Sequence, residues 1–218
     1  MNITTAIFDM DGLLLDTEPL WGESMLRVAE RHKIPITPAR FKETTGLRIY
    51  EVTEYWSIKY PWQGAAHDRV AEEILDDIIE ASRQKGKVLS GVVKALELLK
   101  ENGYKIGLAS SSPTRMIHTL VAHFGIQDYF DCITSADEVA LGKPHPAVFL
   151  KCAEQLGSKP IACVALEDSV NGVIAGKAAR MKVIAIPDVL HFDDPRFSIA
   201  DAKLSSMEDF ELEMLRAW

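Results

Sequence analysis

Short apolar runs that alternate with longer amphipathic segments constrain the fold of this chain more than any other feature. Five runs have the length and composition of buried strands, at residues 4–8, 105–109, 131–134, 162–166 and 183–186. Segments with helical spacing separate the last four runs, at residues 116–124, 147–157 and 170–180. The runs show little alternation of polar and apolar residues, as expected when helices cover both faces of a sheet. The pattern predicts an α/β fold with a Rossmann-like, doubly wound parallel sheet.

A long insertion separates the first predicted strand from the second. One helix and two loops would connect them, yet residues 9–104 intervene. The insertion contains helical segments bounded by proline or glycine, at residues 24–32, 39–46, 49–60 and 67–86, and a core-facing helix follows at 92–103. We therefore expect a main α/β domain formed by residues 1–15 and 85–218, and a small helical domain, residues 16–84, that covers it as a cap.

The composition narrows the classes of partner. The 218 residues are 47% hydrophobic and 26% charged, which is typical of a globular domain with a substantial core. Acidic residues outnumber basic ones by 32 to 24, so the surface as a whole repels polyphosphate backbones and anionic lipids. No apolar segment approaches the ~18 residues of a membrane span. The sequence predicts a cytoplasmic protein with no nucleic-acid or membrane partner, which can bind a small anion only at a local positive site.

The three cysteines, Cys132, Cys152 and Cys163, are odd in number and form no CxxC pair. They lie within apolar or helical segments, so we expect three buried, reduced thiols.

Polar residues follow the predicted strands where the carboxyl ends of those strands meet one edge of the sheet. Open parallel sheets bind their ligands at this edge. Acids follow the first and fourth runs, serines follow the second, and a lysine lies in the sequence GKPHP: Asp9, Asp11, Ser110, Ser111, Ser112, Lys143, Glu167 and Asp168. Their order and their common placement favour a functional site.

Each of these groups also has a purely structural interpretation. Asp9 or Asp11 alone could form a turn or cap a helix. Ser112 could be the N-cap of a helix whose first residue is Pro113. Lys143 could be an ordinary surface lysine, and the acids after the fourth run could merely begin a helix.

Together, the residues suit the transfer of a phosphoryl group. The start of the helix after Ser110 can hold phosphate oxygens with backbone N–H groups, and Lys143 adds a full positive charge. Three carboxylates, Asp9, Asp11 and Asp168, would repel one another unless a hard cation lay among them. Mg²⁺ characteristically binds one or two carboxylates, water and a substrate phosphate. We therefore expect Mg²⁺ as the cofactor and a phosphorylated metabolite as the substrate.

Four segments, in order, resemble the four motifs of the haloacid dehalogenase superfamily: Asp9-Met10-Asp11-Gly12, Ser110 after an apolar run, Lys143 in GKPHPAVF, and Glu167-Asp168. The resemblance covers the whole chain, because the helical insertion lies where the C1-type cap of this superfamily is placed. The segments LLLDTEPLW, TTGLR, GLASSSP, KPHPAVFL and LEDSVNGVIAGKAARM look like its small sugar-phosphate phosphatases and β-phosphoglucomutases. The resemblance implies an enzyme that hydrolyses phosphoric monoesters.

The resemblance also implies roles for the residues that handle the phosphoryl group. Asp9 would be the nucleophile that forms an aspartyl-phosphate. Asp11 would be the general acid that protonates the leaving oxygen and then the base that activates water. Ser110, the amide of Ser111, and Lys143 would hold the phosphoryl group.

By the same resemblance, Mg²⁺ would be bound by Asp9, the backbone carbonyl of Asp11, and Asp168. Glu167 would support the metal site without binding the ion directly. In similar caps a basic residue contacts the site, and Arg48 is the candidate here. A solvated arginine at the start of a helix is an equally compatible interpretation.

Two departures from the family patterns bear on the reaction. The dehalogenating branch lacks the second aspartate, so Asp11 favours a phosphoryl substrate. The β-phosphoglucomutases carry a histidine at the position that aligns with Trp21, and tryptophan cannot transfer a proton. Trp21, Trp56 and Trp62 could line a sugar pocket, although tryptophans more often fill the core of a helical cap. The role of Glu18 is left open.

The leading interpretation is a monomeric, Mg²⁺-dependent phosphatase that acts on a small sugar or sugar-alcohol phosphate, with hexitol phosphates among the first candidates. A hexose-phosphate mutase related to β-phosphoglucomutase and a non-catalytic phosphate-binding module remain as alternatives.

Overall fold

The computed structural model describes residues 2–44 and 47–218, which form two compact units. One unit joins Met1–Asp16 to Val88–Trp218, and the other is Thr17–Lys87. The first unit contains a parallel sheet flanked by helices, so the predicted α/β fold is confirmed.

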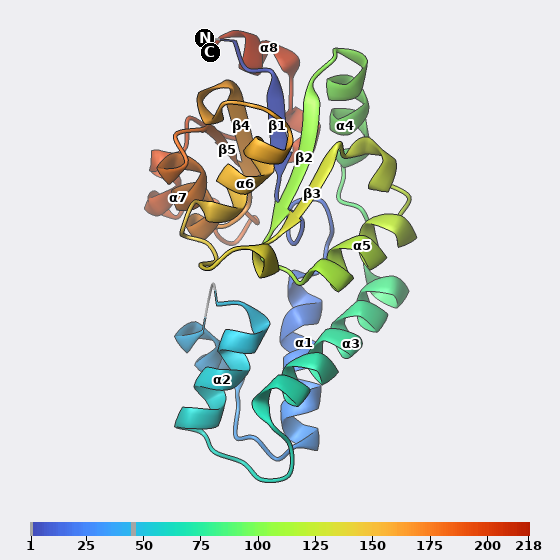
Figure 1. Ribbon diagram of the computed structural model, residues 1–218, viewed down its shortest axis with the longest axis vertical. Helices are drawn as coiled ribbons and strands as arrows, with labels where there is room; N and C mark the ends of the chain where they lie inside the picture. Colours follow the sequence, from blue (N-terminus) through green and yellow to red (C-terminus); the bar gives the residue numbers. More distant parts are fainter. Residues whose placement is uncertain (1, 45–46) are drawn as a thin grey trace. The chain divides into compact units, whose positions relative to one another are not determined.

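Six parallel strands form this sheet in the spatial order β3-β2-β1-β4-β5-β6. The strands β1 to β5 are labelled in Figure 1. They are β1 Thr5–Phe8, β2 Lys105–Ser110, β3 Cys132–Ser135, β4 Cys163–Glu167, β5 Lys182–Ala185 and β6 Ala202–Lys203. The central strand β1 pairs with both β2 and β4, so Phe8 lies beside Leu108 and Leu166. Strand order reverses at β1, and open α/β sheets bind their ligands beyond the carboxyl ends at such a reversal.

The first five strands match the predicted apolar runs to within a residue at each end, whereas β6 has no counterpart among them. β6 has only two residues, which is too short to produce a recognisable pattern. Backbone bonds hold the segment in place, since Asp201 N donates to Val183 O and Leu204 N donates to Ala185 O, both at 2.9 Å.

Helices cover both faces of the sheet. They are α4 Val92–Glu101, α5 Thr114–His123, α6 Ala147–Gln155 and α7 Val170–Ala178, with a short α8, Leu212–Arg216, near the end of the chain. Helices α6 and α7 share an apolar core with Ile7, Ala109 and Ala165 of the sheet. Helix α4 contacts β2 and helix α5 contacts β3, and right-handed crossovers place both helices on the opposite face.

The second unit is helical, with α1 Glu18–Arg31, a 3₁₀ helix Pro38–Glu43, α2 Ile49–Lys59 and α3 His67–Lys85. Helix α3 packs against α1 and α2. Trp56 is fully buried in the core of this unit, and Trp21 and Trp62 are partly buried against it, so Trp56 fills the core. Of the helical segment expected at 39–46, Thr45 and Gly46 lie outside the described residues.

Two expectations from composition can be compared with the structure. Cys152 and Cys163 are buried as predicted, but Cys132 is only half-buried, because it begins β3 at the edge of the sheet.

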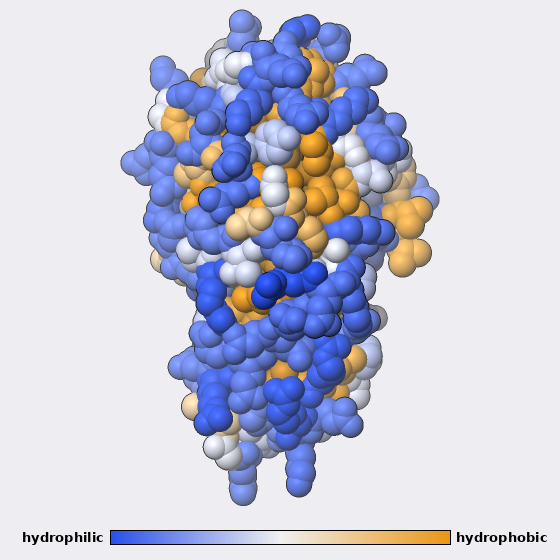
Figure 2. Space-filling model, turned by 90° about the vertical axis from the view of Figure 1, so that its right-hand side faces the viewer, coloured by the Kyte–Doolittle hydropathy of each residue, from blue (hydrophilic) through white to orange (hydrophobic). Residues whose placement is uncertain are grey.

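Hydrophilic residues predominate on the face drawn in Figure 2. Within residues 2–44 and 47–218, no helix combines the length and the apolar character needed to cross a membrane.

Candidate active site

The turn after β1 brings Asp9 and Asp11 to the carboxyl edge of the sheet. Asp9 N donates to Leu166 O at 3.1 Å and so continues the pairing with β4. Met10 is fully buried, and its carbonyl accepts bonds from the N–H groups of Leu14 and Leu15. Gly12 has a φ of 76°, in the left-handed region that favours glycine, so the chain can turn sharply here. The buried Met10 thus anchors a turn that carries the two acids.

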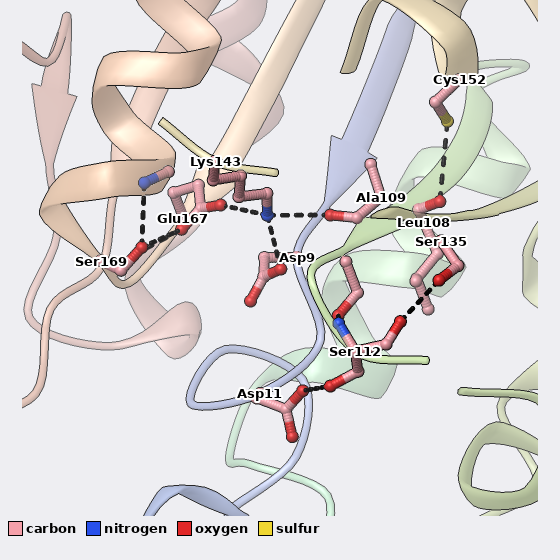
Figure 3. A network of polar contacts seen from close by, with 12 residues as sticks. Asp9, Asp11, Leu108, Ala109, Ser112, Ser135, Lys143, Cys152, Glu167 and Ser169 are labelled. Atoms are coloured by element: carbon pink, nitrogen blue, oxygen red, sulfur yellow. Dashed lines mark hydrogen bonds and ion pairs between the residues drawn. The ribbon is translucent and has the colours of Figure 1, made fainter. Parts of the chain in front are cut away.

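Lys143 lies at the centre of a polar network (Figure 3). Its Nζ donates to Asp9 Oδ1 at 2.6 Å, to Glu167 Oε1 at 2.5 Å and to Ala109 O at 2.9 Å. The lysine is only 6% exposed, so the interpretation as a surface lysine is wrong. These contacts join the ends of β1, β2 and β4, three neighbouring strands.

The charges of this network depend on one another. Burial raises the pKa of the Glu167 carboxyl to about 7, although the neighbouring charge of Lys143 acts in the opposite direction. Burial acts to lower the pKa of Lys143, but the charges of Asp9 and Glu167 more than offset this effect and raise it above its ordinary value. Lys143 therefore supplies a fixed positive charge next to Asp9.

Glu167 is held from several sides at the end of β4. Its Oε2 accepts bonds from the backbone N–H and the hydroxyl of Ser169, at 3.3 and 3.1 Å, while Oε1 faces Lys143. Ser169 also caps α7, since its Oγ accepts a bond from Gly172 N at 3.0 Å. A Cβ at Gly172 would lie 1.8 Å from Glu167 Cδ, so only glycine leaves room for the carboxylate. Both oxygens of Glu167 are thus engaged by protein groups.

Three acids lie close enough together to share a cation. Asp9, Glu167 and Asp168 each offer one carboxylate oxygen, and these oxygens lie within 4.8 Å of one another. The Asp11 carboxylate, which the sequence grouped with Asp9 and Asp168 around a cation, does not belong to this cluster of described residues, and Glu167 belongs to it instead. Oxygen donors of this kind match a hard divalent cation such as Mg²⁺.

The serines after β2 form a second network around Asp11 (Figure 3). Ser112 Oγ donates to Asp11 Oδ2 at 2.6 Å, and Ser112 N donates to Ser110 Oγ at 3.0 Å. Ser135, at the end of β3, donates its hydroxyl to Ser112 O at 2.7 Å. Ser110 is buried and Ser111 is half-buried in the same turn. The structure therefore brings the predicted serine segment to Asp11.

The predicted N-cap of the following helix is wrong. Helix α5 begins at Thr114 with Pro113 as its N-cap, and the Ser112 hydroxyl makes no capping bond. Asp137 Oδ2 instead accepts a bond from Thr114 N at 2.9 Å. The hydroxyl of Ser112 is turned toward Asp11, and no local pattern distinguishes this serine from its two neighbours in SSSP.

Arg48 belongs to the second unit and is the N-cap residue of α2. Its side chain donates to Glu51 Oε1 at 2.6 Å, and its backbone N–H donates to Glu51 Oε2 at 2.8 Å. These bonds give Arg48 a structural role at the start of the helix. A role toward substrate stays a prediction.

Two curated relatives resemble the chain over most of its length. Hexitol phosphatase B of Escherichia coli strain K12 is 44% identical over 209 residues, which are 95% of this chain and 94% of that protein. A phosphorylated carbohydrates phosphatase of Thermotoga maritima is 35% identical over 182 residues, which are 82% of each protein.

Solved structures share the fold. CbbY from Rhodobacter sphaeroides, in complex with phosphate, matches with a TM-score of 0.85 at 23% identity. The match covers 95% of this chain and 96% of the CbbY chain. A β-phosphoglucomutase from Clostridium difficile matches with a TM-score of 0.83 at 26% identity. The match covers 99% of this chain and 96% of the mutase chain.

The family assignment rests on the sequence as well as on the fold. The sequence profile of the family described as haloacid dehalogenase-like hydrolase matches residues 6–186, a span that begins in β1 and ends just after β5. The predicted resemblance and the expectation of a hydrolytic enzyme are confirmed. The chain belongs to the haloacid dehalogenase-like hydrolase family.

Proposed function

We propose that this phosphatase hydrolyses a small sugar or sugar-alcohol phosphomonoester through an aspartyl-phosphate on Asp9. The observation that carries the mechanism is the placement of the Asp9 carboxylate at the switch point of the sheet, 2.6 Å from Lys143 Nζ. The 44% identity to hexitol phosphatase B supports the substrate class and makes a hexitol phosphate the first candidate.

Asp9 attacks phosphorus, and the bond to the sugar oxygen breaks as the bond to the carboxylate forms. Lys143 reduces the repulsion between the anionic nucleophile and the phosphate dianion. Ser110 and the amide of Ser111 hold phosphate oxygens beside β2. Lys143 already donates a hydrogen bond to Asp9, so its ammonium group needs little rearrangement to contact the phosphate.

Asp11 protonates the departing sugar oxygen and afterwards takes a proton from the water that hydrolyses the aspartyl-phosphate. Its separation from the acid cluster suits this role, because a carboxylate used for proton transfer must stay available to the leaving group. Its bond to Ser112 keeps the side chain at the same edge of the sheet as Asp9.

The donor set around Asp9 fits Mg²⁺. Asp9, Asp168 and the backbone carbonyl of Asp11 would hold the ion, and Glu167 would support the site from outside because both its oxygens are engaged by Lys143 and Ser169. When bound, Mg²⁺ would supply positive charge that offsets the charge of the phosphate.

The helical unit Thr17–Lys87 would act as the cap that selects the substrate. Arg48 is the proposed contact to the substrate, and closure would exclude water until the leaving group is in place. The cytoplasmic location, the monomeric state and the absence of a nucleic-acid partner stay predictions.

A phosphate-release screen over hexitol, hexose and glycolytic phosphates with Mg²⁺ tests the proposal. We expect turnover of at least one sugar or sugar-alcohol phosphate, and its loss in Asp9→Asn and in excess chelator. Asp193→Asn, which changes an exposed aspartate, is the matched control and should retain activity. Phosphate release that survives in Asp9→Asn would contradict the mechanism, and transfer of label from a bisphosphate faster than phosphate release would favour the mutase.

A further inference from the structure

We propose that Ser112 is a positioning residue that orients the carboxylate of Asp11 for its proton transfers. The inference rests on the proposed function, because it concerns how that same reaction obtains a correctly placed acid and base. Ser112 would act through Asp11 and would not itself contact the reacting atoms.

The contact between the two side chains is short and well shielded. Ser112 Oγ lies 2.6 Å from Asp11 Oδ2, in the range of a hydroxyl bond to a charged acceptor. Ser112 is 5% exposed, whereas Asp11 is half-buried in a turn. A carboxylate on a turn can occupy several rotamers, and a bond from a buried hydroxyl restricts it to those that point toward β2.

Side chains from two strands fix Ser112 independently of Asp11. The backbone N–H of Ser112 donates to Ser110 Oγ at 3.0 Å, and its carbonyl accepts the hydroxyl of Ser135 at 2.7 Å. Ser135 Oγ in turn accepts a bond from Asp137 N at 3.0 Å. The hydroxyl is therefore held in place before substrate binds, which is the condition for an effective positioning group.

Capping of helix α5 does not explain why a serine occupies position 112. Pro113 is the N-cap of α5, and Asp137 Oδ2 satisfies the N–H of Thr114. The polar partner that the structure gives the Ser112 hydroxyl is Asp11, the proposed acid and base. Ser112 would thus be required by the reaction more than by the fold.

A comparison of leaving groups tests this role. Ser112→Ala should lower kcat on a hexitol phosphate by about 10- to 100-fold, the factor expected when one hydrogen bond to a charged group is lost, with KM little changed. The same variant should give an unchanged burst of phenolate from an aryl phosphate, because a phenolate leaves without a proton from Asp11. Ser112→Thr, which keeps the hydroxyl, should restore turnover of the hexitol phosphate. Ser135→Ala should show the same pattern with a smaller loss.

Ser205→Ala is the matched control, since Ser205 Oγ also lies 2.6 Å from an aspartate oxygen, that of Asp209, in an exposed pair. It should leave both rates unchanged. In Ser112→Ala, equal losses of kcat on the hexitol phosphate and of the burst rate on the aryl phosphate, or no loss of either, would overturn the inference. If Ser112→Ala does not fold, Ser112→Cys provides a second side chain without the hydroxyl. The same two rates, kcat on the hexitol phosphate and the burst on the aryl phosphate, are then compared in that variant. A wild-type protein that releases no phosphate from any substrate would instead refute the proposed function.

Discussion

Lys143 and Glu167 form a buried ion pair, with Nζ 2.5 Å from Oε1 and with exposed fractions of 6% and 0%. The same lysine also lies 2.6 Å from Asp9, so one cation is shared between two acids, with Asp168 nearby. The cluster therefore has more negative than positive charge. A buried excess of this kind favours the binding of a cation.

Replacement of Lys143 by methionine should impair both stability and activity. The free energy of unfolding should fall by about 3–5 kcal/mol in the absence of metal, because Glu167 is left buried without its cation. Phosphatase activity should be lost as well, since Asp9 loses its cationic partner. Chemical denaturation and phosphate release measure the two effects.

Lys151→Met is the control for this experiment. Lys151 Nζ lies 2.9 Å from Glu138 Oε2, and both side chains are about one-third exposed, at 32%. Such a pair contributes about 0–1 kcal/mol. Equal destabilisation by the two substitutions would contradict the assignment of a special role to the buried pair.

Mg²⁺ should stabilise the protein even without substrate. At a concentration about 100 times its Kd, a ligand that binds only the folded chain adds about 2.7 kcal/mol to the free energy of unfolding. Thermal unfolding with increasing Mg²⁺ should therefore show a rising Tm, and Asp168→Asn should weaken the rise. The exposed Asp193→Asn should leave it unchanged. A Tm that rises equally in wild type and Asp168→Asn would place the ion elsewhere.

Site residues could be identified from the sequence where the residues next to them along the chain form a recognisable pattern. Asp9 follows an apolar run directly, and Lys143 lies in a distinctive segment before a predicted helix, so both could be assigned to one edge of the sheet from the sequence. The doubly wound parallel sheet could also be anticipated, because alternating strands and helices admit few topologies, and five of its six strands were predicted. The sixth strand, β6, has two residues and was too short to leave a signal.

What the sequence could not show depends on contacts between distant segments. Ser112 and Asp11 are 101 residues apart, and the fold alone turns that hydroxyl away from the helix cap. The partial exposure of Cys132 likewise follows from the position of β3 at the sheet edge, which no local pattern encodes. Spatial neighbours, rather than residue types, decide these features.

Gly172→Ala should destabilise the protein although the glycine lies in a helix. Its Cβ would meet the Glu167 carboxylate at 1.8–2.1 Å, and the carboxylate cannot move without leaving Lys143 and Ser169. We expect a loss of about 3 kcal/mol or more, at the upper end of the range for overpacking, with reduced activity.

Gly22→Ala provides the matched comparison in helix α1. A Cβ there lies 3.5 Å from a ring carbon of Phe41, an ordinary contact. Alanine should raise stability by about 0.5–1 kcal/mol, as helix propensity predicts. If both substitutions changed the denaturation midpoint in the same direction, close packing at Gly172 would not be the cause.

Asp11→Asn should separate the two chemical steps of the proposed reaction. The asparagine oxygen can still accept the bond from Ser112, so the side chain keeps its orientation while its acid and base functions are lost. Turnover of a hexitol phosphate should fall by about 10²- to 10⁴-fold. With an aryl phosphate the phosphorylated form of Asp9 should still appear and then accumulate, because its hydrolysis lacks the base. Intact-mass measurement after rapid quenching detects this species, which Asp9→Asn cannot form. Fast hydrolysis of the intermediate in Asp11→Asn would show that another group activates the water.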